Sequence, residues 1–128
     1  EGLAALDQHV EDPLARLRAY TDYWAECIRD GTLSMCICAM LAAELPMIPS
    51  EIADQVKGYF DDLTRWIATV LDSGAERSQF RLCGSALVEA QAFMSTIHGA
   101  MLTARALDDP GSFRAISQVA IGRLIALG

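Results

Sequence analysis

Residues 85–107 read SALVEAQAFMSTIHGAMLTARAL, a run of 23 residues that contains no proline. A helix of this length spans about 35 Å. Its apolar residues recur at intervals of three and four, which is the spacing of one helix face: Leu87, Ala90, Phe93, Met94, Ile97, Ala100, Met101, Ala104 and Leu107. Ser85 stands at its start, and the run Asp108-Asp109-Pro110-Gly111 ends it. The pattern predicts a long helix that decides the fold class.

The segments on either side carry the same kind of signal. Further helices are predicted at 13–30, 32–45, 51–73 and 112–127. Asp12-Pro13 is a start signal, Ser50 and Ser112 are expected N-caps, and Gly74 is an expected C-terminal stop. No segment shows the alternation of a strand, and no internal repeat is present. The sequence therefore predicts an all-α bundle of about five main helices.

Length and composition narrow the function classes. The chain has 128 residues, 52% of them hydrophobic, and a net charge of −7. These values predict one folded domain and argue against direct contact with a phosphate backbone. No apolar run reaches the length of a membrane span, and no signal peptide is recognised, so we expect a cytoplasmic domain with no membrane partner. Because the first residue is Glu1, within an apparent helix, we also expect the chain to be part of a longer one.

The charge is distributed unevenly along the chain. Residues 1–83 hold 14 acidic and 7 basic side chains, whereas residues 84–128 hold 3 of each. The apolar stripes of the last two predicted helices are broader than one core can cover. We therefore expect these two helices to form a four-helix-bundle interface in a homodimer. The expected interface residues are Leu87, Ala100, Ala104, Leu107, Phe113, Ile116, Ala120, Ile121 and Leu124.

Three blocks in this order resemble a known family. The first is Asp12-Pro13-Leu14 with Arg16-Leu17, followed by the helix of small residues that ends Leu41-Ala42-Ala43-Glu44. The second is the aromatic-rich helix with Tyr59-Phe60, Leu63 and Trp66, and the third is the run from Ala90 through Ile97-His98-Gly99 to the closing helix. Together they resemble the C-terminal regulatory domain of TetR-family transcriptional repressors.

The resemblance implies that ligand binding and DNA binding are carried out by two different domains. Residues 1–128 would form the ligand-binding and dimerisation domain, with residues 1–10 at the end of the helix that connects it to a DNA-binding domain. The helix-turn-helix of the family has no counterpart in this sequence, so DNA would be bound only through that absent N-terminal domain. The chain would bind a small, largely apolar effector and so control operator binding.

The effector pocket is expected where apolar and aromatic side chains face the centre of the bundle. The candidate lining residues are Trp24, Cys36, Met40, Tyr59, Phe60, Leu63, Trp66, Phe93, Met94, Ile97, His98 and Met101. Each of them could equally serve only to fill the core. His98 is the most informative polar member, because it lies in an apolar run beside Gly99. It could hydrogen-bond an effector, or be a buried histidine satisfied by the backbone.

Enzymatic signatures are missing from the sequence. It has no glycine-rich phosphate loop, no Glu-x-x-His pair and no Gly-x-Ser-x-Gly. We expect no catalytic residue, no metal site and no cofactor. The four cysteines fit no metal or redox spacing, although Cys36 or Cys38 could sense an oxidant or electrophile. Two alternatives thus remain beside the repressor domain: a cysteine-based sensor and a freestanding dimeric interaction module.

Overall fold

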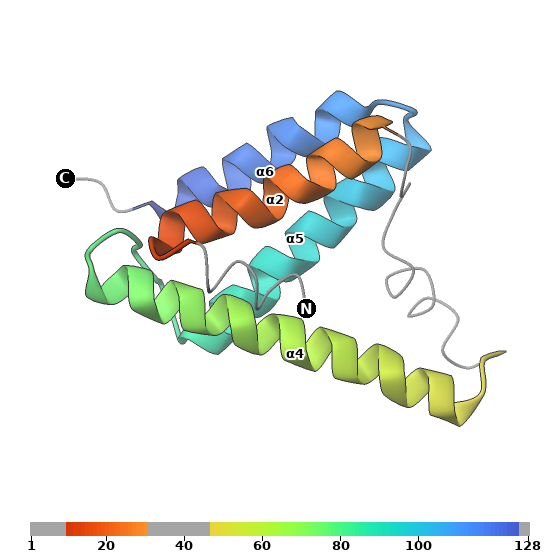
Figure 1. Cartoon of the computed structure of the whole chain (residues 1–128), viewed down its shortest axis with the longest axis horizontal. Coiled ribbons are helices and arrows are strands. Elements are labelled where there is room, and N and C mark those ends of the chain that lie inside the picture. The colour runs from red at the N-terminus through yellow and green to blue at the C-terminus, as the bar shows by residue number, and fades with distance from the viewer. Residues whose placement is uncertain (1–9, 31–46, 126–128) are drawn as a thin grey trace.

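The structure, a computed structural model, describes residues 10–30 and 47–125 (Figure 1). Within these ranges it contains four helices: α2 (Pro13–Asp30), α4 (Ser50–Glu76), α5 (Ala86–Ala106) and α6 (Pro110–Leu124). The predicted all-α class is confirmed. The remaining predicted helix, at 32–45, lies outside the described residues, as do residues 1–9 and 126–128.

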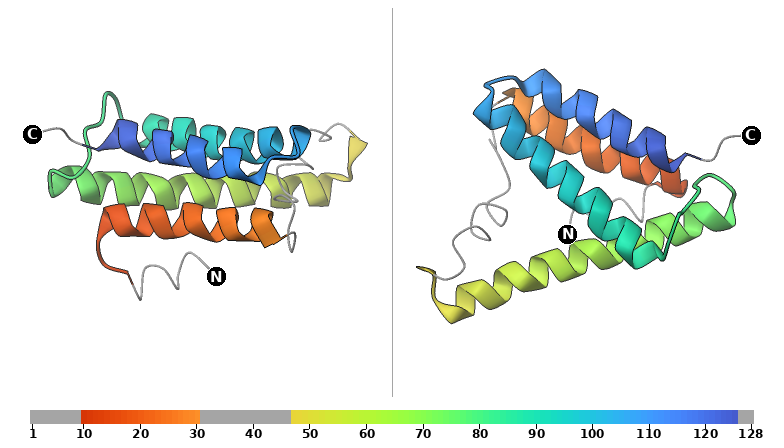
Figure 2. Two further views of the ribbon diagram at one scale, coloured as in Figure 1. Left: turned by 90° about the horizontal axis from the view of Figure 1, so that it is seen from above. Right: turned by 180° about the vertical axis from the view of Figure 1, so that it is seen from behind.

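The helix α5 is central to the arrangement. It packs against α6, to which a short turn joins it, and its first half crosses α4 (Figures 1 and 2). The helix α2 lies alongside α6 and also contacts α4. The helix α5 therefore has two neighbours on different sides, α4 on one side and α6 on the other.

Apolar side chains from all four helices meet in one core. Five large ones have no exposed surface: Leu17 from α2, Ile67 and Leu71 from α4, Ile97 from α5 and Phe113 from α6. Burying a side chain of this size stabilises a fold by about 1.5–3 kcal/mol. The apolar periodicity of the sequence is thus the main source of the packing energy.

The start of α2 is held by a cap that reaches across the fold. The Asp12 carboxylate accepts a hydrogen bond from the Ala15 amide at 2.9 Å, which confirms the predicted start at Asp12-Pro13. Gln79, in the loop after α4, donates its side-chain amide to the same carboxylate and accepts from the Leu14 amide at 3.3 Å. The loop after α4 therefore satisfies two groups at the start of α2.

Predicted caps at other helix starts are partly wrong. Ser85 does cap α5, since its hydroxyl accepts from the Val88 amide at 3.2 Å. Ser50, in contrast, is already the first residue of α4, and Ser112 lies inside α6. The helix α6 begins earlier because Pro110 takes its first position, where the fixed φ of proline suits a helix.

The predicted end of α4 at Gly74 is also wrong, because the helix continues to Glu76. Gly74 is buried, and a Cβ at this position would overlap the ring of Phe80. Beyond the ring, the Arg81 amide donates to the Leu124 carbonyl at 2.8 Å, next to a bridge between Phe80 and Ile125. Gly74 thus allows the loop to approach the helix closely, and it does not end the helix as the sequence suggested.

Candidate functional site

His98 lies at the contact between α5 and α4. Its side chain is only 7% exposed, and its Nδ1 lies 2.9 Å from the carbonyl oxygen of Met94, one turn earlier in α5. A carbonyl oxygen can only accept, so Nδ1 must carry the proton and donate it. In the neutral imidazole this leaves Nε2 as a bare acceptor.

Two aromatic rings of α4 surround the imidazole. The Phe60 and His98 ring centroids are 5.3 Å apart and tilted by 59°, and those of Tyr59 and His98 are 6.3 Å apart and nearly perpendicular. Tyr59 and Phe60 also contact each other edge to face at 5.1 Å. These separations are typical of attractive aromatic pairs. Tyr59 and Phe60 are consecutive in the sequence of α4. Both contact His98 because α5 crosses α4 at this point.

A second polar group stands near these rings. The buried Thr64 donates its hydroxyl to the sulfur of Met94 at 3.3 Å. Thr64 is one turn after Phe60 on α4, and Met94 is the residue whose carbonyl accepts from His98. A thioether sulfur is a weak acceptor, so this hydroxyl proton is only weakly held. We call Tyr59, Phe60, Thr64, Met94 and His98 the His98 cluster.

The Nε2 atom of His98 is buried and has no hydrogen-bond partner among the residues that the structure describes. A buried acceptor left without a donor costs about 1–3 kcal/mol relative to one that is satisfied. Unsatisfied buried polar groups are rare in folded proteins, and a bound ligand is one way in which such a group is satisfied. The sequence singled out His98 but could not show which of its two nitrogen atoms is free.

The predicted pocket residues other than Phe93 divide into four groups. Tyr59, Phe60, Met94 and His98 come together as predicted, whereas Leu63, Ile97 and Met101 are core residues at most 2% exposed. Trp24 and Trp66 are half-buried at the edge of the core, where Trp66 packs on Tyr20 with centroids 5.8 Å apart. Cys36 and Met40 lie outside the described residues.

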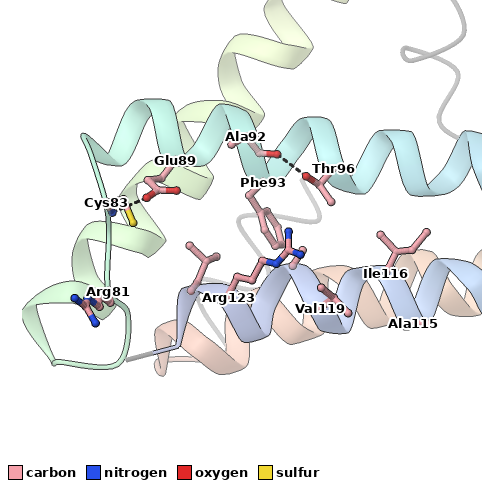
Figure 3. Close-up of a pocket in the computed structure, with 12 residues that line it drawn as sticks. Arg81, Cys83, Glu89, Ala92, Phe93, Thr96, Ala115, Ile116, Val119 and Arg123 are labelled. Atoms are coloured by element: carbon pink, nitrogen blue, oxygen red, sulfur yellow. Dashed lines mark hydrogen bonds between the residues drawn. The ribbon is translucent and has the colours of Figure 1, made fainter. Parts of the chain in front are cut away.

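Phe93, another predicted pocket residue, lies on a different side of α5 from His98. It is five residues before His98, which places the two side chains about 140° apart around the helix. Figure 3 shows its ring reaching from α5 towards α6. Thr64, conversely, was missed by the sequence analysis. Its position one turn after Phe60, on the same helix face, is the signal that could have identified it.

A groove of about 600 Å³ opens between α5 and α6, on the side of Phe93 (Figure 3). Its walls include Ala92 and Thr96 of α5 and Ile116, Val119 and Arg123 of α6. Val119 is 53% exposed, and so are other large apolar residues of these helices, such as Val88 at 60%. The two helices thus present an apolar surface to solvent on the face away from α4.

The residues predicted for a dimer interface are not all on this surface. The structure buries Ala100, Ala104, Phe113, Ile121 and Leu124 within the protomer, with exposures of at most 6%. Side chains that are buried within their own protomer have no accessible surface left to bury against a second protomer. Leu87 and Leu107 are 51% and 64% exposed, while Ile116 and Ala120 are half-buried along the groove. The predicted helices thus carry an exposed face, but several of the predicted positions point the other way.

Membrane-spanning helices and metal-binding clusters are both absent from the described part of the chain. No helix there is long and apolar enough to cross a membrane. No group of three or more His, Cys, Asp or Glu side chains in residues 10–30 and 47–125 is placed to hold a metal ion.

Comparison with solved structures gives three close matches in fold. A TetR-family transcriptional regulator from Agrobacterium tumefaciens is 42% identical, with a TM-score of 0.94 over 98% of this chain and 66% of that chain. The regulatory protein TetR from Rhodobacter sphaeroides and a TetR transcriptional regulator from Legionella pneumophila are each 19% identical. Their TM-scores are 0.82 and 0.80 over 95% of this chain, and this likeness shows the fold alone. The chain spans slightly less than two thirds of each of these proteins.

Comparison with family models and with curated proteins completes the assignment. No curated protein gave a match. The family model described as "Tetracyclin repressor-like, C-terminal domain" matches residues 13–120, which include all of α2, α4 and α5 and most of α6. The chain therefore belongs to the family of tetracycline repressor-like C-terminal domains.

Proposed function

We propose that this chain is the regulatory domain of a ligand-responsive transcriptional repressor. It binds a small, largely apolar effector at the His98 cluster and dimerises through α5 and α6. DNA is bound by a helix-turn-helix domain outside these 128 residues. Membership of a family of repressor-like domains supports the class, and the net charge of −7 fits a domain that does not itself grip DNA.

One observation carries the mechanism: α5 holds the His98 cluster on one side and the groove against α6 on another. An effector that binds between α4 and α5 favours one position of α5 relative to α4. Any such shift moves the surface on which a second protomer rests, and with it the angle between the two halves of the dimer. The separation of two DNA-reading domains then changes, and the operator is released.

The proposed dimer surface follows the exposed face of each helix. On α5 it consists of small or apolar residues at intervals of three and four: Val88, Ala92, Thr96, Gly99 and Thr103. On α6 it consists of Ala115, Ile116, Val119, Ala120 and Arg123, all of which line the groove. Small side chains let helices of two protomers approach closely, and a two-fold axis buries the same surface on both.

Substitution of Val119 by arginine tests this interface. Val119→Arg would place an unpaired charge in an apolar contact, which costs several kcal/mol per partner and appears twice in a two-fold dimer. We expect the unaltered chain to be a dimer at 20 μM, about the range used for light scattering, and the variant to be a monomer. Size-exclusion chromatography with multi-angle light scattering measures both masses.

Tyr23→Arg is the matched control. Tyr23 is 56% exposed, close to the value for Val119, but it lies on α2, away from the groove. This variant should remain a dimer. A monomeric unaltered chain, or equal dissociation by both substitutions, would contradict the proposed interface.

A further inference from the structure

We infer that the effector of this domain is a neutral aromatic molecule carrying a hydroxyl group, which donates its proton to Nε2 of His98. The inference rests on the proposed effector-binding function and specifies its ligand. Three observations carry it: the state of the His98 ring, the rings around it and the location of the nearby charges.

The first observation is the direction in which His98 can hydrogen-bond. Its Nδ1 proton is held by the Met94 carbonyl at 2.9 Å, so the neutral ring offers a lone pair, not a proton, at Nε2. That atom is buried without a partner among the described residues. A ligand that brought only acceptor groups, such as an ether or a ketone, would leave Nε2 unsatisfied. A ligand with an O–H group satisfies it.

The second observation is the apolar and aromatic character of the surroundings. Phe60 and Tyr59 pack against His98, and both residues remain only half-buried. Aromatic ligands gain both apolar burial and favourable ring geometry at such a site. Thr64 adds one hydroxyl whose present partner is the Met94 sulfur, and it can donate to an oxygen of the ligand instead.

The third observation concerns charge. Two ion pairs lie at the surface of this part of α4, Lys57 with Asp61 at 3.8 Å and Asp62 with Arg65 at 3.7 Å. All four are more than half exposed. With the His98 ring neutral, none of the five residues of the His98 cluster is an ionised partner for a carboxylate or an amine. An ionised ligand would be buried without a counter-charge, whereas a neutral one would not.

A pair of matched probes tests the inference on the full chain. 2-Naphthol carries the hydroxyl proton, and 2-methylnaphthalene replaces the hydroxyl by a methyl group of similar size. Equilibrium dialysis gives a dissociation constant for each probe. The preference for 2-naphthol is the ratio of the two constants, and it is compared between the unaltered chain and His98→Phe. This comparison cancels the intrinsic difference in hydrophobicity between the probes.

We expect the preference for 2-naphthol to fall by about 10-fold in His98→Phe, because the hydroxyl loses its buried acceptor. His98→Gln places an amide oxygen near the position of Nε2 and should keep part of the preference. Circular dichroism verifies that both variants remain folded. If His98→Phe does not fold, the His98→Gln comparison alone must show a reduced but measurable preference.

The ring state is checked independently by ¹⁵N NMR of the histidine side chains. The chain has two histidines, so loss of one signal set in His98→Gln assigns the other to His9. We expect protonated Nδ1 and unprotonated Nε2 for His98, with Nε2 shifting when 2-naphthol is added. Protonated Nε2 in the free protein would overturn the inference.

The binding outcomes separate the inference from the function on which it rests. Equal preference in the unaltered chain and in His98→Phe would overturn the hydroxyl requirement and leave the apolar effector site intact. Failure of both probes to bind the unaltered chain would overturn the inference and the effector site at the His98 cluster together.

Discussion

The ring of Phe80 lies against the backbone of Gly74, in the space that a Cβ at position 74 would occupy. Both residues are buried, so neither can move into solvent to relieve an overlap. We expect Gly74→Ala to lower the free energy of unfolding by about 1–3 kcal/mol, the usual effect of overpacking a core. Urea denaturation followed by circular dichroism measures the change.

Two further variants identify the cause. Gly58 is also helical, but a Cβ added there would meet no neighbouring atom within 4 Å, so Gly58→Ala should stabilise α4 by about 0.5–1 kcal/mol. In a Phe80→Ala background the loss caused by Gly74→Ala should largely vanish. A loss of the same size in both backgrounds would show that Phe80 is not responsible.

Asp12 links the stability of the fold to pH. The hydrogen bond from Gln79, followed by that from the Ala15 amide, lowers the pKa of this carboxyl below its ordinary value of 3.8. Because the folded pKa is the lower one, the ionised carboxylate stabilises the folded state above about pH 3.8, and this contribution is lost as the pH falls through the folded pKa.

The corresponding prediction compares Asp12→Asn with the unaltered chain. At pH 7 the variant should be less stable by less than about 1 kcal/mol, since the carboxylate is close to water. The difference should shrink as the pH falls below 3.8 and Asp12 takes up its proton in the folded state. Urea denaturation across this range checks it, with the exposed Glu11→Gln as control. A difference that stays constant down to pH 2 would refute the assigned role.

At the scale of helices, α4 and α5 end in the same way. The Ser78 amide donates to the Ala75 carbonyl, and the Asp108 amide donates to the Arg105 carbonyl, in each case from the first residue beyond the C-cap. The residue that follows donates to a carbonyl five positions earlier, Gln79 to Gly74 and Asp109 to Ala104. This pair of bonds is the Schellman motif, which requires a left-handed residue and usually has glycine there.

Here neither of the left-handed residues is glycine. Ser78 has φ 61° and Asp108 has φ 52°. We therefore expect Ser78→Gly and Asp108→Gly each to raise the free energy of unfolding by about 0.5–1 kcal/mol, because glycine relieves the Cβ strain of this conformation. Thermal and urea denaturation measure both.

Ser95→Gly provides the control for these two substitutions. Ser95 lies in the middle of α5, in ordinary helical conformation, so glycine there should destabilise by about 0.5 kcal/mol. If all three substitutions destabilised the protein, the left-handed strain at Ser78 and Asp108 would not be the dominant effect.

At the scale of the whole molecule, α5 joins two surfaces that would otherwise be independent. His98 faces α4, while Ala92 and Thr96 face the groove beside α6. The ion pair between Arg114 and Asp22, at 3.0 Å, adds a contact between α6 and α2, but both side chains are about half exposed. Such pairs contribute little, so the apolar core holds α2 and α6 together. In the proposed repressor, this core carries a change at α5 to the rest of the domain.

The amino-acid pattern alone was enough for the helical class and for α2 and α5 to within about a residue. It also singled out His98, whose role in binding stays a prediction. These features are local: apolar spacing, Asp12-Pro13 and Ser85 act within one or two turns of the chain. The repressor-like family was also identifiable from the order of its blocks, and the comparisons confirm it.

Features that depend on helices crossing were not accessible in this way. Phe93 and His98 belong to one apolar stripe in the sequence, yet α4 covers one of them and α6 adjoins the other. Ala100, Phe113 and Leu124 are equally apolar on either side of a helix, and only packing shows that they are internal. Gly74 matches a helix stop until the loop after α4 folds Phe80 back onto it. A single helix has no preferred neighbour, so which face meets which partner is decided only when the elements pack together.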